Sequence, residues 1–209
     1  MWKLLVGLAI AVTVVVVVAW LRTAADRVLF LRRSGLVLMA VWTVVGGAWI
    51  AAEMFADPGG WPAVGLIAAW LAPPAALLAV TWYRPDVATV LLGALTAAAV
   101  GAGLWAALDP EPWRAFENDN GPVRAIMTFV LAAPIALLGW TRPRPAGVLL
   151  VVLGVVPVAL AAAGAVSGLG SLIVVSVPPV LTGILYLLAD ALAKRAWATP
   201  TTPAVAVRR

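Results

Sequence analysis

Cysteine, histidine and glutamine are missing from this chain of 209 residues, and charged residues make up only 11% of it. Without cysteine there can be no disulfide bonds and no thiolate metal ligands. Without histidine there is no imidazole for acid–base catalysis, zinc binding or haem ligation. The sequence therefore excludes the usual metal and haem centres and histidine-dependent catalysis, and no cofactor is expected.

Hydrophobic residues, by contrast, account for 64% of the chain. Soluble domains contain roughly 45–50% apolar residues, and a chain of this length could not bury such an excess in a core of its own. The apolar runs are continuous, as at 14–18 and 148–158, and lack the alternation of a membrane β-barrel. We therefore expect an all-α integral membrane protein, because helices satisfy their own backbone hydrogen bonds in lipid.

Seven stretches are long enough to cross a hydrocarbon layer of ~30 Å, which takes about 20 apolar residues. The expected transmembrane helices are about 4–21, 35–54, 62–82, 87–108, 123–141, 146–166 and 171–191. They predict a single polytopic domain over 1–193 and a basic, disordered cytoplasmic tail over 194–209. Seven spans would place the two ends of the chain on opposite sides of the membrane.

The basic residues divide unequally between the two sides that this topology defines. Eleven of the fourteen lysines and arginines fall on the side of the C-terminus, in short loops beside apolar spans. The positive-inside rule makes that side cytoplasmic, so the N-terminus is expected outside and the C-terminus inside. Membrane orientation thus explains the net charge of +5, and no nucleic-acid partner is expected.

A repeated motif underlies three of the expected helical hairpins. Residues 74–85 read PAALLAVTWYRP and residues 134–145 read PIALLGWTRPRP, with seven of twelve positions identical. The first copy covers about 35–85 and the second about 87–145, and the sixth and seventh spans resemble a diverged third copy. Two spans per copy preserve the orientation, which predicts a leading helix followed by three parallel-repeat hairpins.

The N-terminal region allows two interpretations. Lys3 and the apolar run after it could be a signal peptide removed in the mature protein, although the run is long for that role. Otherwise it is the first transmembrane helix. The basic segment 22–34 that follows is expected to lie along the inner membrane surface and to contact anionic lipid head groups through Arg22, Arg27, Arg32 and Arg33.

The repeated prolines mark a candidate ligand cavity. Pro74 and Pro134 fall near the bilayer midplane, and Pro179 stands at a similar depth in the third copy. A proline frees the carbonyl four residues earlier, and interrupted spans at matching places in repeats indicate midplane binding sites. With Trp70 and Tyr186 these prolines form the predicted cavity. The alternative is that the repeat simply copied a kink, and that the tryptophan packs between helices.

A second candidate site is polar and lies on the outer face. It comprises Glu53, Asp109, Glu111, Glu117 and Asp119. Closely spaced carboxylates could serve a hydrolase or bind Ca²⁺, but the loop has no EF-hand pattern, so no metal is predicted. A solvated loop is the simpler interpretation. No ionisable group falls near the centre of any span, which disfavours ion-coupled transport.

The chain contains no motif for nucleotide binding and no lysine within a span for a retinal Schiff base. Its use of Ala, Val, Arg and Gly resembles that of multi-pass proteins of high-GC bacteria, which predicts a location in the bacterial cytoplasmic membrane. The first hypothesis is a non-enzymatic accessory or scaffold subunit, with a membrane-protein partner or further copies of itself. The second is a small permease or a protein that binds a lipid or another hydrophobic ligand, and the third is an enzyme that uses Glu53 and the outer acids.

Overall fold

The structure is a computed structural model that describes residues 26–56, 60–113, 115, 123–162 and 169–198. Its architecture is all-helical. Six long helices occur in the order α2 (Arg27–Ala56), α3 (Gly60–Tyr83), α4 (Pro85–Leu108), α6 (Val123–Thr141), α7 (Pro143–Ala162) and α8 (Leu169–Ala198). They correspond to the second to seventh predicted spans, and the first predicted span, 4–21, lies outside the described residues.

Five of these helices are long and apolar enough to cross a membrane. The qualifying segments are Arg27–Trp49, Val64–Tyr83, Pro85–Leu108, Pro143–Leu160 and Val175–Ala196. The apolar part of α6 is shorter and covers Ile126–Thr141. The described helices therefore fit a membrane protein.

Helix α2 begins earlier than its sequence predicted. Arg27, Arg32 and Arg33 were expected in a separate segment along the membrane surface. That prediction is wrong for 27–34, because this segment forms the first turns of α2. Asp26 caps this helix, because its Oδ1 accepts a hydrogen bond of 2.9 Å from the backbone N–H of Leu29. With a cap at Asp26 and no proline after it, nothing interrupts the helix where the prediction placed a break.

Helix α8 ends later than predicted. It continues to Ala198, so the residues from 194 to 198 extend the last helix and are not part of a disordered tail. In its last turns Lys194 forms an i, i+4 ion pair with Asp190, with Nζ 2.6 Å from Oδ2. This pair supports the last turns of α8.

Single residues separate α3 from α4 and α6 from α7. Arg84 and Arg142 occupy these positions, and each is followed by a proline that opens the next helix. Proline suits the first turn of a helix, where its missing N–H is not needed. The two turns remain hydrogen-bonded through the backbone N–H of each arginine, at 2.8 Å from the carbonyl oxygens of Val80 and Leu138.

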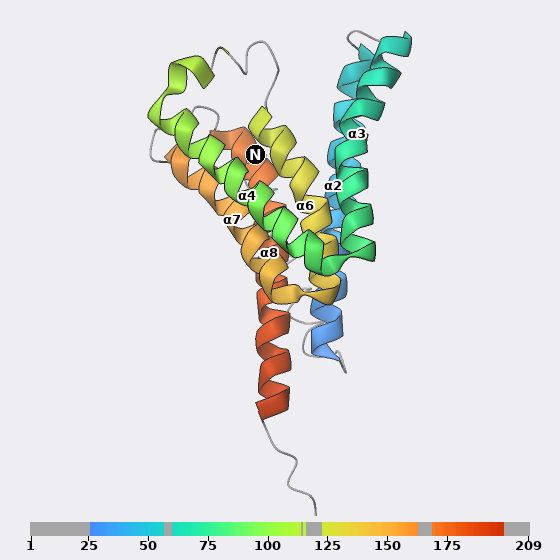
Figure 1. The fold of residues 1–209 in the computed structure, drawn as a ribbon, viewed down its shortest axis with the longest axis vertical. Helices are drawn as coiled ribbons and strands as arrows, with labels where there is room; N and C mark the ends of the chain where they lie inside the picture. Colours follow the sequence, from blue (N-terminus) through green and yellow to red (C-terminus); the bar gives the residue numbers. More distant parts are fainter. Residues whose placement is uncertain (1–25, 57–59, 114, 116–122, 163–168, 199–209) are drawn as a thin grey trace, which may run out of the picture.

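Successive helices run in alternating directions, and α2 lies beside α3 and also packs against α8 (Figure 1). The start of α2, both single-residue turns and the end of α8 therefore lie toward one end of the bundle. We call this the basic end, because it carries Arg27, Arg32, Arg33, Arg84, Arg142, Arg144, Lys194 and Arg195.

The closest helix contact joins α7 to α8. A Cβ added to Gly147 would lie 2.9 Å from the carbonyl oxygen of Gly183, and one added to Gly154 would lie 2.8 Å from that of Ser176. The two backbones can approach this closely only because glycine has no side chain at these positions. Around this pair the core is formed by leucine, alanine and isoleucine side chains of α4, α6 and α7, together with Met39 and Tyr186.

Helices α3 and α4 are much less covered than α7 and α8. Only 6% of the spanning window of α3 and 17% of that of α4 are buried, against 33% for α7 and for α8. Large apolar side chains such as Trp61, Val90 and Leu108 are among the most exposed of the protein. Much of the surface of these two helices therefore faces the surroundings of the bundle.

The glycine contacts predict which substitutions destabilise the bundle. Gly147→Ala and Gly183→Ala force a methyl group against a backbone oxygen, and each should lower the free energy of unfolding by about 1–3 kcal/mol. Gly93→Ala is the matched control, because a Cβ there meets nothing within 4 Å. Unfolding in mixed detergent, followed by circular dichroism, measures the difference. Equal stability of the three variants would contradict the backbone contact between α7 and α8.

Candidate functional site

Tyr186, one of the five residues predicted to line a cavity, instead fills the space where α2, α6 and α8 meet. It is fully buried, and its ring lies against Gly35 and Gly139, where an added Cβ would collide with the ring. Its hydroxyl donates a hydrogen bond of 2.7 Å to the carbonyl oxygen of Ala136. The hydroxyl is therefore used to join α8 to α6.

The predicted prolines are not equivalent in the structure. Pro134 and Pro179 are among the fully buried residues of α6 and α8, whereas Pro74 is half-buried on α3. All three helices continue through their prolines. Trp70 packs against α2, with its ring 4.0 Å from the position of a Cβ on Gly47, and its buried indole N–H has no partner among the described residues.

A cleft lies between α3 and α6, and α4 bounds it. It has a volume of about 550 Å³, and we call it the proline cleft. Its lining comprises Pro73, Ala76, Leu77, Leu95, Ala98, Ala99, Ile126, Met127, Val130 and Leu131. The predicted proline Pro74 is next to a lining residue, and Val130 is the residue whose carbonyl Pro134 leaves free. Sequence reasoning pointed to α3 and α6 but missed the alanines of α4, which carry no motif.

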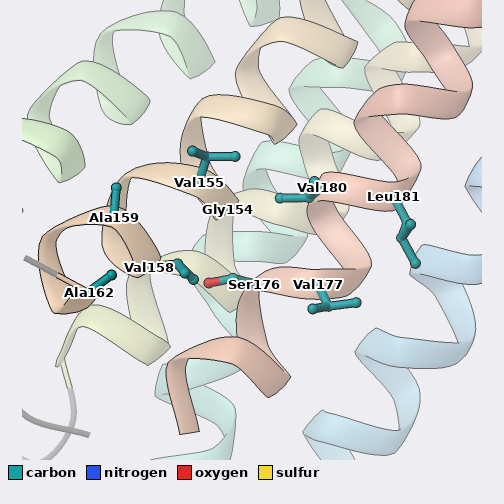
Figure 2. A pocket seen from close by; sticks show the side chains of 9 residues that line it. All are labelled: Gly154, Val155, Val158, Ala159, Ala162, Ser176, Val177, Val180 and Leu181. Atoms are coloured by element: carbon teal, nitrogen blue, oxygen red, sulfur yellow. The ribbon is translucent and has the colours of Figure 1, made fainter. Parts of the chain in front are cut away.

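A second groove lies between α7 and α8 (Figure 2). It has a volume of about 500 Å³, and its walls are valine, alanine and leucine side chains with one hydroxyl, from Ser176. In Figure 2 that oxygen is directed toward Val158 across the groove. Gly154, which brings the two helices together, forms part of its floor. Such a surface suits an apolar molecule better than a charged one.

The structure places the predicted outer polar site only in part. Asp109 and Glu111 are exposed, and residues 110–113 are helical. The side chain of Glu53 and all of Glu117 and Asp119 lie outside the described residues. Within the described segments, no three carboxylates or other metal-binding side chains are grouped to hold an ion.

The basic end carries a second ion pair, which joins the two single-residue turns. Arg142 at the turn between α6 and α7 pairs with Asp86 in the first turn of α4. From α2, the Arg32 Nη1 atom donates a hydrogen bond of 3.3 Å to the carbonyl oxygen of Trp140. Nothing in the repeated motif indicated that Asp86 and Arg142 meet.

The fold and these surfaces define the class of the protein as a helical, apolar protein with several helices suited to a membrane. The chain matches no protein family model, no curated protein and no solved structure. The surfaces of the bundle are therefore the guide to its function.

The hydrogen bond of Tyr186 gives a testable prediction. Tyr186→Phe removes the link to Ala136 but keeps the ring, and should lower the free energy of unfolding by about 0.5–1.5 kcal/mol. Tyr83→Phe is the control, because the Tyr83 side chain is 76% exposed. Thermal unfolding in detergent measures both variants. A Tyr186→Phe protein as stable as the control would show that the link contributes nothing.

Proposed function

We propose that this protein is a non-enzymatic accessory or scaffold subunit of the bacterial cytoplasmic membrane, which associates with other membrane proteins through the small-residue row of α4. This row consists of Gly93, Ala97 and Gly101, one turn apart on the helix. A Cβ added to Gly93 or Gly101 meets nothing within 4 Å, and Ala97 is exposed. This is the observation that carries the proposal.

The contact between α7 and α8 shows what such rows can do in this protein. There, Gly147, Gly154 and Gly183 allow two helices to meet at their backbones. Small residues at regular helical spacing permit the same approach between separate membrane proteins. The row of α4 has the small residues but no neighbour among the described helices, so a partner helix could pack there without a clash.

In the proposed topology the segment 4–21 adds a seventh span, with the N-terminus outside and the C-terminus in the cytoplasm. Three features support it: the alternating helices, the concentration of arginines at the basic end, and prolines inside α3, α6 and α8. The same prolines support a parallel repeat of three hairpins, α2 with α3, α4 with α6, and α7 with α8.

The basic end is also the proposed contact with anionic lipids. Arg27 and Arg33 are exposed on the first turns of α2, where head groups can reach them, while Arg32 is partly withdrawn toward α6. Each exposed arginine near a negatively charged leaflet contributes about 1 kcal/mol of attraction. Arg22, included in the same prediction, lies outside the described residues.

The scaffold proposal predicts that larger side chains on the row of α4 prevent association. The double variant Ala97→Leu, Gly101→Leu should weaken a helix–helix contact by at least about tenfold, because two leucines separate the backbones. The assembly is measured by native mass spectrometry of protein extracted from its own membrane into nanodiscs. The control is Ala40→Leu, an exposed alanine of α2.

A defined assembly should be present for the native chain and for Ala40→Leu but lost in the α4 variant. A native protein that is always a lone monomer, and that moves a solute across liposome membranes, would contradict the scaffold role. An assembly that survives the two leucines would show that the contact lies elsewhere on the surface.

The proline cleft favours a second candidate function, the binding of a lipid chain or another hydrophobic molecule. It is larger than the groove between α7 and α8, and α3 and α6, which carry the clearest repeat, line it together with α4. Because Pro134 and Pro179 are buried in the core, replacing the three predicted prolines would disturb packing as well as any site. Side chains that fill the cleft provide a sharper test.

Ala76→Leu with Ala98→Leu should occupy much of the proline cleft and reduce the binding of a hydrophobic ligand by about tenfold or more. Binding is measured as the fraction of protein that retains a co-purified ligand in native mass spectra. Ala94→Leu is the control, since this exposed residue of α4 does not line the cleft. Equal ligand retention in both variants would exclude the cleft as the binding site.

A further inference from the structure

A small crevice at the basic end lies between the last turns of α3 and α6. Its volume is about 160 Å³, and its lining residues are Thr81, Trp82, Leu137, Trp140 and Thr141. At roughly 30 Å³ per water molecule, this space holds a group of about five waters. That is the scale of a lipid head group, and it is too small for a complete lipid.

The two walls of the crevice are the ends of the two copies of the repeat. Thr81 and Thr141 occupy the same position in the aligned motifs, and each copy places a tryptophan beside its threonine. The ion pair between Arg142 and Asp86 holds together the turns that follow. The crevice is thus formed where the repeat brings two similar segments against each other.

The hydrogen-bonding groups of the crevice are arranged as both acceptors and donors. The Thr81 hydroxyl donates to the carbonyl oxygen of Leu77 at 2.7 Å, and that of Thr141 to Leu138 at 3.3 Å. The lone pairs of both hydroxyl oxygens are therefore left to accept bonds from a ligand. The indole N–H groups of Trp82 and Trp140 make no hydrogen bond within the described segments and can donate.

Positive charge surrounds this part of the basic end. Arg32 reaches Trp140 from α2, and its Nε atom is buried without a partner among the described residues. Arg84 follows Trp82 by two residues, and Arg144 follows Thr141 by three. Both are exposed, and in the described part of the chain neither forms an ion pair. Asp86 is the only carboxylate of these turns, and it is already paired with Arg142.

We propose that this crevice binds the head group of one anionic phospholipid that carries a hydroxyl, such as phosphatidylglycerol. The arginines attract the phosphate, the threonine oxygens accept bonds from the head-group hydroxyls, and the two exposed indoles flank the glycerol backbone at the interface. The inference rests on insertion in a membrane but not on the scaffold role. It identifies a site distinct from the exposed arginines of α2.

The experiment titrates the full-length protein in detergent with phosphatidylglycerol or phosphatidylcholine and counts bound lipids by native mass spectrometry. One phosphatidylglycerol should bind in clear preference to phosphatidylcholine. Arg84→Gln with Arg144→Gln should weaken that binding by at least about tenfold, because the proposal gives each arginine a charge-assisted contact with the phosphate. Trp82→Leu, at an exposed position, should also weaken it, and circular dichroism checks that each variant is folded.

The matched control is Arg27→Gln with Arg33→Gln, which removes two exposed arginines of α2 that attract anionic lipid only in a general way, and it should weaken the binding of the single preferred phosphatidylglycerol clearly less than the Arg84 and Arg144 variant does. If this control loses as much affinity as the Arg84 and Arg144 variant, the attraction is a diffuse surface potential and the site is refuted. Displacement of the lipid by millimolar inorganic phosphate would also overturn the proposal, because the crevice would then bind a free anion. The α4 variant Ala97→Leu, Gly101→Leu should retain the lipid, which separates this test from that of the scaffold role.

Discussion

The backbone contact between α7 and α8 is the interaction on which the rest of the bundle depends. In lipid there is little hydrophobic gain from bringing two helices together, so association relies on close packing. Gly147, Gly154 and Gly183 provide that packing over several turns. Once α8 is fixed in this way, Tyr186 fills the junction with α2 and α6, and its hydroxyl joins α8 to α6.

Helices α3 and α4 are covered less closely than α7 and α8. Helices α3 and α4 leave most of their spanning surface uncovered, and the glycines of α4 at 93 and 101 have open space beside them. The same residue type therefore has two roles in one chain. Where two glycine-containing helices meet they form the core, and where one faces outward it provides a surface on which another helix can pack.

The sequence indicated some of the helices and residue types that line the candidate sites, but not which residues lie together. The repeat drew attention to α3 and α6, between which the proline cleft lies, whereas Tyr186 and Pro179 belong to the packed core. A sequence repeat shows that positions are equivalent along the chain. It does not show which helix packs against which, and that packing decides whether a proline or a tyrosine lines a cavity.

The sequence by itself determined that the chain is helical and suited to a membrane, because a high apolar content in continuous runs leaves no other way to satisfy the backbone. It also determined helix boundaries to within a few residues wherever proline or glycine interrupts a run. The exceptions were the start of α2 and the end of α8, where local caps and ion pairs extend the helices. Only the tertiary structure decided which small residues are buried, that Arg142 meets Asp86, and that the two copies of the repeat enclose a crevice. These features depend on contacts between residues far apart in the chain, which local periodicity does not encode.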